Sequence, residues 1–184
     1  VLHGCGQTAA SYDLGAGWST LARHYGFALL MPEQQSANNG NTCFNWFDPE
    51  DIARGQGEAA SIREMVGHLA GAHKIDPRRI FVTGLSAGGA MTTVMLATYP
   101  DVFAAGAVIA GLPFGVAGNL REALGGMMQG SALSAPELGG RGIGSKLARA
   151  TLDAVRAQKI KLVVKCEFIQ GFMKKNPEYD DLLG

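Results

Sequence analysis

Short apolar runs alternate along the first 130 residues with longer segments in which apolar residues recur every three or four positions. The short runs predict strands, and the wider spacing predicts amphipathic helices. Strands and helices alternating at these intervals favour a mostly parallel sheet with helices on both faces. The pattern places strands at 1–2, 27–31, 79–83 and 103–110, and helices at 16–25, at 58–72, between Ser86 and Pro100, and at 120–128.

The pattern changes after about residue 130. Small residues dominate 131–136, which we interpret as a linker between a first domain at 1–130 and a second segment at 137–184. An acidic excess in the first 140 residues also gives way to a basic excess, which indicates a separate functional face or a join between unlike segments. The second segment predicts an α/β arrangement, with a helix at 145–158, a strand at 160–164 and a helix at 168–175.

Composition narrows the class of partner. Apolar residues make up 47% of the chain and charged residues 17%, which is typical of a folded globular protein. The formal net charge is zero and no long basic run occurs, so we expect no nucleic-acid partner. No apolar run approaches the roughly 18 residues that a membrane-spanning helix needs, so we expect no membrane partner either.

One motif carries chemistry. Gly84-Leu85-Ser86-Ala87-Gly88 follows a predicted strand and precedes a predicted helix. This is the setting of a nucleophile elbow, where a serine sits on a sharp turn and flanking glycines avoid a backbone clash. The helix N-terminus also directs N–H groups at developing negative charge. The motif therefore predicts Ser86 as a nucleophile, with an accidental Gly-rich turn as the alternative.

A second Gly-rich turn, His3-Gly4-Cys5-Gly6, directly follows the Val1-Leu2 strand end. An oxyanion hole needs an N–H from a loop after an earlier strand and another from the residue after the nucleophile. We therefore expect the N–H groups of Cys5 and Ala87 to be the two donors. The alternative is a Gly-rich turn without a catalytic part.

The predicted mechanism lacks a base. A serine hydroxyl needs a base to take its proton, and in this fold the chain order is Ser, then Asp or Glu, then His. No histidine follows Ser86. His24 and His68 are expected on helix surfaces and His73 near a helix C-terminus, while His3 is a weak substitute base because it belongs to the oxyanion loop. The catalytic triad is incomplete.

Several motifs together resemble the esterase/poly(3-hydroxybutyrate) depolymerase family over about residues 1–130. They are Leu2-His3-Gly4-Cys5, Ala37-Asn38-Asn39, Cys43-Phe44-Asn45-Trp46-Phe47, the segment Gly84 to Met91, and Ile109 to Gly115. The resemblance implies an α/β-hydrolase fold, truncated here at both ends, and hydrolysis of small or polymeric carboxylic esters through an acyl-enzyme. It also implies a disulfide between Cys5 and Cys43, against the alternative of two free buried thiols.

Residues 33–57 lack periodicity and are rich in Asn, Gly, Gln and aromatic residues, which predicts a long functional loop. The aromatic residues Phe44, Trp46 and Phe47, with His3, are candidates for a substrate pocket, since an apolar cleft suits an ester. The same aromatic residues are equally consistent with an apolar core formed within the loop itself.

The C-terminal stretch, about 134–183, resembles the last third of a small GNAT-superfamily acetyltransferase. The Gly-rich turn 139–144 and Asn176-Pro177-Glu178-Tyr179 carry the likeness. In that family such a turn offers N–H groups at a helix N-terminus to the pyrophosphate of acetyl-CoA. The resemblance thus implies Arg141, Gly142, Gly144 and Ser145 as acetyl-CoA ligands, against an ordinary capped loop, while Cys166 is expected to pack in a core.

We therefore interpret the chain as a partial α/β-hydrolase followed by a small acetyltransferase-like tail, with ester hydrolysis at Ser86 as its function, impaired by the missing histidine. An acetyl-CoA-dependent acyltransferase and a non-catalytic fused remnant are the alternatives. No cofactor is expected, except acetyl-CoA under the first alternative, and no metal site is assigned. Cysteine usage favours an oxidising compartment and the tail favours the cytoplasm, so the compartment and the oligomeric state stay open.

Overall fold

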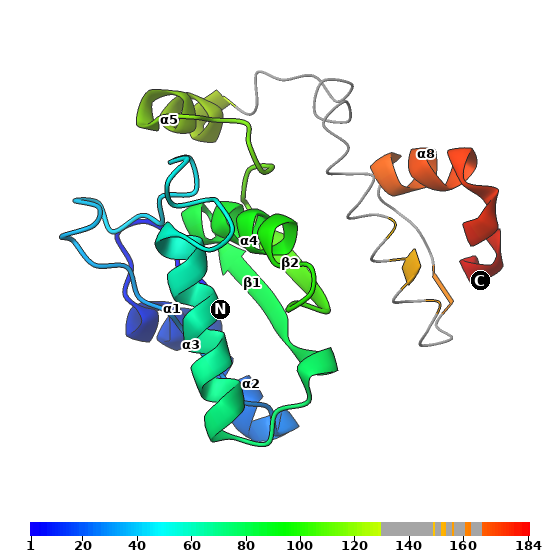
Figure 1. Ribbon diagram of the computed structural model, residues 1–184, viewed down its shortest axis with the longest axis horizontal. Helices are drawn as coiled ribbons and strands as arrows, with labels where there is room; N and C mark the ends of the chain where they lie inside the picture. Colours follow the sequence, from blue (N-terminus) through cyan, green and yellow to red (C-terminus); the bar gives the residue numbers. More distant parts are fainter. Residues whose placement is uncertain (130–148, 150–151, 154–155, 157–160, 163–166) are drawn as a thin grey trace. The chain divides into compact units, whose positions relative to one another are not determined.

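The computed structural model describes residues 1–129, 149, 152–153, 156, 161–162 and 167–184 (Figure 1). The chain divides into two compact units, Val1–Ala132 and Leu133–Gly184. The boundary between the units falls inside the segment 131–136, where the sequence predicts a linker.

A small parallel sheet organises the first unit. Strand β1 (Phe81–Leu85) pairs in parallel with β2 (Ala105–Ile109), so that Phe81 lies opposite Ala105 and Leu85 opposite Ile109. Leu2 forms a parallel bridge with Gly84. Leu85 N–H donates to Leu2 O while the next N–H, that of Ser86, donates to Ile109 O, so the two neighbours lie on opposite edges of β1. Strand β1 is therefore central.

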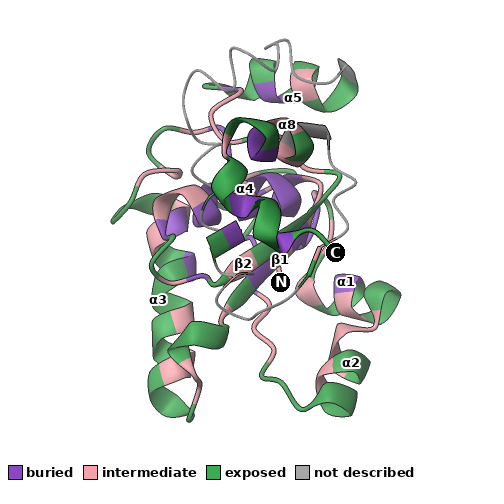
Figure 2. Ribbon diagram, turned by 90° about the vertical axis from the view of Figure 1, so that its right-hand side faces the viewer, coloured by how far each residue is buried: buried purple, intermediate pink, exposed green. Residues whose placement is uncertain are grey.

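Helix α4 (Ala87–Thr98) packs on this sheet and forms the centre of the core (Figure 2). Nine of its twelve residues are buried, because the helix is apolar on nearly every side. Val82 is buried on the sheet face beneath the helix, whereas Phe81, on the opposite face, is 61% exposed. The core of the unit also includes Leu2, Met91, Val94, Met95, Tyr99 and Phe103.

The remaining described helices of this unit lie around that core. They are α1 (Ala9–Ala16), α2 (Trp18–Tyr25), α3 (Gly57–Ala72), the 3₁₀ turn η1 (Pro77–Arg79) and α5 (Leu120–Gln129). The helices expected at 58–72, after Ser86 and at 120–128 are confirmed by α3, α4 and α5. Thr8 caps α1 by accepting a hydrogen bond from the N–H of Ser11, while the Ser11 hydroxyl accepts from the N–H of Thr8.

The helix expected at 16–25 is confirmed by α2, which begins at Trp18 because Gly17 takes a left-handed conformation (φ 73°) that ends α1. One expectation for the first 31 residues is wrong. The apolar run 27–31 is not a strand, and Phe27 is 42% exposed. Apolar composition favours burial, but a strand also needs a neighbouring ladder, and this run joins none of the ladders among the described residues.

The described part of the second unit is built around its own apolar cluster. Helix α8 (Glu167–Lys175), which confirms the helix expected at 168–175, is followed by the 3₁₀ segment η2 (Pro177–Leu182). Tyr179 is buried at its centre and donates its hydroxyl proton to Asp153. The cluster consists of Leu152, Phe172, Met173, Tyr179 and Leu182. The helix at 145–158 and the strand at 160–164 fall largely outside the described residues.

Substitution of Gly88 by alanine tests the close packing of α4 against the neighbouring backbone. A Cβ at Gly88 would lie 2.3 Å from Leu2 O and 2.5 Å from His3 O, and backbone atoms cannot move aside. We expect Gly88→Ala to lower the free energy of unfolding by about 3 kcal/mol, the upper range for overpacking. Chemical denaturation measures this difference.

Gly71→Ala in α3 is the matched control, because nothing lies within 4 Å of a Cβ placed there. Removing a helical glycine in open space raises stability by up to about 1 kcal/mol. Equal effects of the two substitutions would contradict the contact at Gly88.

Candidate active site

Ser86 lies on a strained turn between β1 and α4. Its backbone angles are φ 56° and ψ −118°, a region that residues with a side chain rarely adopt. The glycines of the motif explain how the turn closes, since a Cβ at Gly84 would lie 2.3 Å from the carbonyl oxygen of Gly88. A Cβ at Gly89 would lie 2.7 Å from Ile109 O. The small residues therefore let the helix meet the sheet at van der Waals limits.

The hydrogen bonds around Ser86 fix its backbone and leave its side chain unpaired. Ser86 N–H donates to Ile109 O at 2.9 Å, so this N–H is committed to the sheet. Ala87 is the first residue of α4, where N–H groups have no acceptor within the helix. Ser86 Oγ is half-buried and makes no hydrogen bond to any described residue.

The histidines lie where they cannot activate Ser86. His24 and His68 are exposed on α2 and α3, and His73 caps the C-terminus of α3. His3 is 1% exposed, and both of its ring nitrogens are engaged, one with Gly4 O and the other with the N–H of Gln34. Because the chain has four histidines, no imidazole forms a hydrogen bond with Ser86.

The turn after Leu2 lies against Ser86. A Cβ at Gly4 would lie 3.4 Å from the Cβ of Ser86. Gly4 N–H donates to Gln7 Oε1 at 2.7 Å, and Gly6 N–H donates to Asn41 O at 2.9 Å. Between them, the N–H of Cys5 has no hydrogen-bond partner among the described residues. The turn thus offers one free N–H donor at the carboxyl edge of the sheet, at the residue expected to serve the oxyanion hole.

Cys5 and Cys43, the pair that the family resemblance implies, are joined by a disulfide across 38 residues of sequence. The bond ties the turn after Leu2 to the long loop that precedes α3. The hydrogen bond from Gly6 N–H to Asn41 O runs beside the disulfide and joins the same two segments. The two segments are therefore joined by one covalent bond and one hydrogen bond.

A half-buried polar network around Gln34 and Glu58, which sequence reasoning missed, organises the long loop. The carboxylate of Glu58 accepts hydrogen bonds from the side chain of Gln34 and from the N–H of Asn45. Gln34 also donates to Cys43 O, and the side chain of Asn45 donates to Asp51. The abundance of Asn and Gln in 33–57 was the one sequence signal for this network.

Glu58 is the charged centre of this network. Burial raises the pKa of Glu58 to about 7, outweighing the hydrogen bonds from Asn45 and Gln34, which favour the charged form. The nearby carboxylates of Asp51 and Asp48 raise its pKa further. The loop is therefore held by a group whose ionisation is costly in the folded state.

The aromatic residues of the loop lie in the interior. Phe44, Trp46 and Phe47 are 3%, 2% and 8% exposed and belong to the core of the first unit. Trp46 and Phe47 pack edge to face, and Phe44 packs against the ring of His3. Of the two interpretations of these residues, the geometry favours the loop core over a substrate pocket, because an ester needs an accessible surface.

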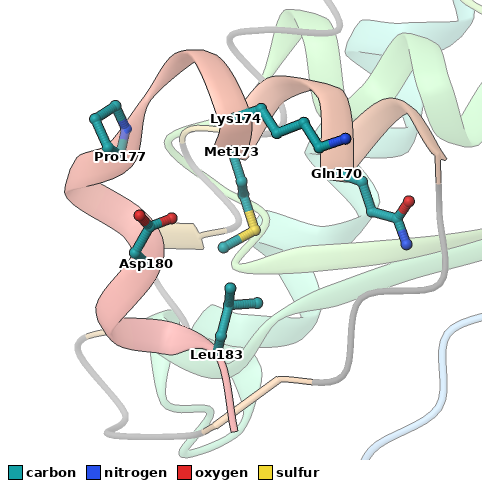
Figure 3. Close-up of a pocket in the computed structure, with 6 residues that line it drawn as sticks. All are labelled: Gln170, Met173, Lys174, Pro177, Asp180 and Leu183. Atoms are coloured by element: carbon teal, nitrogen blue, oxygen red, sulfur yellow. The ribbon is translucent and has the colours of Figure 1, made fainter.

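Ser86 does not line either of two cavities found among the described residues. The larger, of about 970 Å³, is lined mainly by apolar side chains of α2, α3 and the sheet, including Phe27, Val66 and Phe81. The smaller, of about 380 Å³, lies in the second unit between α8 and η2, with Lys174 and Asp180 at its rim (Figure 3).

The expected acetyl-CoA ligands Arg141, Gly142, Gly144 and Ser145, and also Cys166, lie outside the described residues. Among the residues that the structure describes, no group of three metal-ligating side chains occurs. No helix in this part of the chain is long and apolar enough to cross a membrane.

Comparison with known families identifies the family of the first unit. The model of the family described as "Esterase PHB depolymerase" matches residues 1–139. The chain belongs to this family. A model described as "GCN5-related N-acetyl-transferase" matches residues 133–182, so the C-terminal segment is similar to part of that second family.

Three curated relatives and one solved structure show how far the family likeness extends. Poly(3-hydroxyalkanoate) depolymerase C of Paucimonas lemoignei is 58% identical over 123 residues, which cover 67% of this chain and 30% of the relative. Feruloyl esterase B of Neurospora crassa is 40% identical over 113 residues, 61% of this chain and 38% of the relative. The probable acetylxylan esterase A of Aspergillus fumigatus is 36% identical over 145 residues, 76% of this chain and 38% of the relative.

The acetyl xylan esterase structure from Aspergillus awamori superposes with a TM-score of 0.55 at 29% identity, covering 66% of this chain and 43% of that one. The family member described here therefore has the fold of a partial α/β-hydrolase. It spans 30–38% of the length of the three relatives named above.

The raised pKa of Glu58 predicts a specific dependence of stability on pH. Folding favours the protonated carboxyl, so its contribution is fully present below the unfolded pKa of 4.5 and is lost as the pH rises to about 7. Relative to Glu58→Gln, the chain should lose up to about 3 kcal/mol of unfolding free energy across this window. Denaturation of both proteins over the pH range measures the difference.

The Glu58→Gln reference removes the contribution of every other titrating group from this comparison. A difference in unfolding free energy that stays constant with pH would contradict the buried environment of Glu58.

Proposed function

We propose that the first unit is a serine esterase that hydrolyses carboxylic esters through an acyl-enzyme on Ser86. The observation that carries this proposal is the strained backbone of Ser86, with φ 56°, at the junction of β1 and α4. Strain of this kind persists only where the surrounding structure enforces it, and it clusters at functional sites. Family membership supports the same conclusion.

In the proposed reaction, Ser86 Oγ attacks the ester carbonyl carbon and its proton passes to a base. The carbonyl oxygen becomes an oxyanion, for which the N–H groups of Cys5 and Ala87 are the proposed donors. Collapse of the intermediate expels the alcohol, which takes up a proton, and leaves the acyl group on Ser86. Water then attacks the acyl group, releases the carboxylic acid and restores the serine.

Among the described residues no base lies beside Ser86, and this sets the expected rate. No described imidazole is hydrogen-bonded to Ser86, and no histidine follows it in the chain. Enzymes that lack a triad member keep a residual catalysis of roughly 10³–10⁴-fold over water, from substrate binding and the oxyanion hole. We infer a slow esterase, in which water or buffer takes the proton of Ser86.

The substrate class is a short-chain or polymeric carboxylic ester. The names of the relatives include a poly(3-hydroxyalkanoate) depolymerase, a feruloyl esterase and an acetylxylan esterase, which share an ester bond and differ in the acyl group. The Cys5–Cys43 disulfide supports an oxidising, secreted setting.

Hydrolysis of p-nitrophenyl butyrate by the full chain tests the proposal. We expect slow release of p-nitrophenol, a butyryl adduct on Ser86 by mass spectrometry, and loss of both in Ser86→Ala. Added imidazole should accelerate the reaction of the full chain beyond its effect in solution, because it supplies the absent base.

Ser131→Ala serves as a control serine outside the turn. A rate equal in the full chain and in Ser86→Ala, with no adduct, would exclude the esterase and favour a non-catalytic fold remnant.

Acetyl-CoA binding by the second unit is the other candidate function, and the family match at 133–182 favours it. The proposed ligands are Arg141 and the N–H groups of Gly142, Gly144 and Ser145, which would hold the pyrophosphate as an anion at a helix N-terminus. Calorimetric titration of the full chain should show saturable binding that weakens in Arg141→Gln and not in Arg121→Gln. Absence of saturable binding at millimolar acetyl-CoA would exclude this candidate.

A further inference from the structure

The ring of His3 is held in one orientation by three contacts. Its Nε2 lies 3.0 Å from the backbone nitrogen of Gln34, whose N–H donates to it. Its Nδ1 lies 2.7 Å from Gly4 O, and its ring packs against Phe44 with 5.0 Å between the ring centroids. Because His3 is 1% exposed, no water replaces these partners.

The two hydrogen bonds together determine the tautomer. A backbone N–H is a donor only, so Nε2 of His3 must accept and carries no proton. A carbonyl oxygen is an acceptor only, so Nδ1 must carry the proton and donate it to Gly4 O. The ring of His3 therefore fixes the carbonyl group of Gly4 relative to the backbone of Gln34.

The carbonyl of Gly4 and the N–H of Cys5 belong to the same peptide group. The peptide is planar and trans, so the two groups point in opposite directions and turn together. Holding Gly4 O toward His3 leaves the N–H of Cys5 directed away from the ring. This N–H has no partner among the described residues, and the adjoining Gly4 lies against Ser86.

We propose that His3 is a positioning residue that fixes the orientation of the Gly4–Cys5 peptide, so that the N–H of Cys5 is presented to the oxyanion. The inference rests on the proposed esterase function for its catalytic meaning. The burial of His3 and the hydrogen bonds at both ring nitrogens favour this role over the two weighed from the sequence, a residue lining the substrate pocket and a weak substitute base.

The other end of this hydrogen-bond chain is anchored in the long loop. The side chain of Gln34 donates to Glu58 and to Cys43 O, and it accepts hydrogen bonds from the N–H of Gln35 and from Asn38. These partners hold Gln34 in place, and the N–H of Gln34 in turn holds the ring of His3 by its hydrogen bond to Nε2. The loop thus fixes the orientation of the Gly4–Cys5 peptide in two ways, through the hydrogen bonds of His3 and through the Cys5–Cys43 disulfide.

The ring tautomer tests the inference without reference to catalysis. In the full chain labelled with ¹⁵N-histidine, the ring spectrum of His3 should show a protonated Nδ1 and an unprotonated Nε2 near neutral pH. The spectrum of His3→Asn, which lacks this ring, assigns the signals. A protonated Nε2 would overturn the inference whatever the activity.

Acylation kinetics test the positioning role. His3→Phe keeps the ring that packs on Phe44 but loses both hydrogen bonds, whereas His3→Asn keeps a side-chain N–H donor near the place of Nδ1. We expect His3→Phe to slow acylation of Ser86 by about 10²-fold, the effect of losing one oxyanion donor. KM should not change, since the oxyanion forms only in the transition state.

His3→Asn should retain most of the acylation rate, and His68→Phe, at an exposed position of α3, is the matched control for the change from histidine to phenylalanine. Equal rates in His3→Phe and His68→Phe would overturn the inference. Absence of acylation in the unmodified chain would instead refute the esterase, and the ring spectrum alone would then decide the role of His3.

Discussion

The structure of the first unit depends on a close approach between the first turn of α4 and the backbone of its neighbours. At Gly88 the carbonyl oxygens of Leu2 and His3 occupy the space where a side chain would begin, and at Gly84 the carbonyl of Gly88 does the same. Nothing larger than hydrogen fits at either position. This contact bends the chain at Ser86 and brings the turn after Leu2 beside it, so strand, helix and loop meet at one place.

The part of the site that depends on local rules was predictable from the sequence. The motif has a glycine two residues before and two residues after a serine, between an apolar run and an apolar helix. This pattern predicts both the turn and its strain. The helices at 57–72 and 120–129 were predicted closely because their apolar spacing is regular. The run 27–31 was predicted wrongly, because composition reports a preference for burial and not the presence of a neighbouring ladder.

The Cys5–Cys43 disulfide was implied by the family resemblance, whereas the polar support of the site was not predictable, because it consists of contacts between residues far apart in sequence. Gln34 meets Glu58 across 24 residues, and its backbone meets His3 across 31 residues. No periodicity marks such pairs, and each residue alone is typical of a solvated loop. The long irregular segment is held by a disulfide and the half-buried carboxylate of Glu58 in addition to its three core aromatic residues. A polar network of this kind specifies one arrangement of the loop. An arrangement that left some of its polar groups without hydrogen bonds would be higher in free energy than one without the network.

The hydrogen bond from Ser86 N–H to Ile109 O links the strained turn to the end of β2. In that strand Val108 and Ile109 are 42% and 45% exposed, and among the described strands β2 is paired only with β1. The strained backbone of Ser86 is therefore hydrogen-bonded to a strand that, among the described strands, pairs along one edge only. Loss of this one hydrogen bond would free the backbone of Ser86 at the margin of the sheet, so the pairing at the end of β2 determines how firmly the strained turn is held.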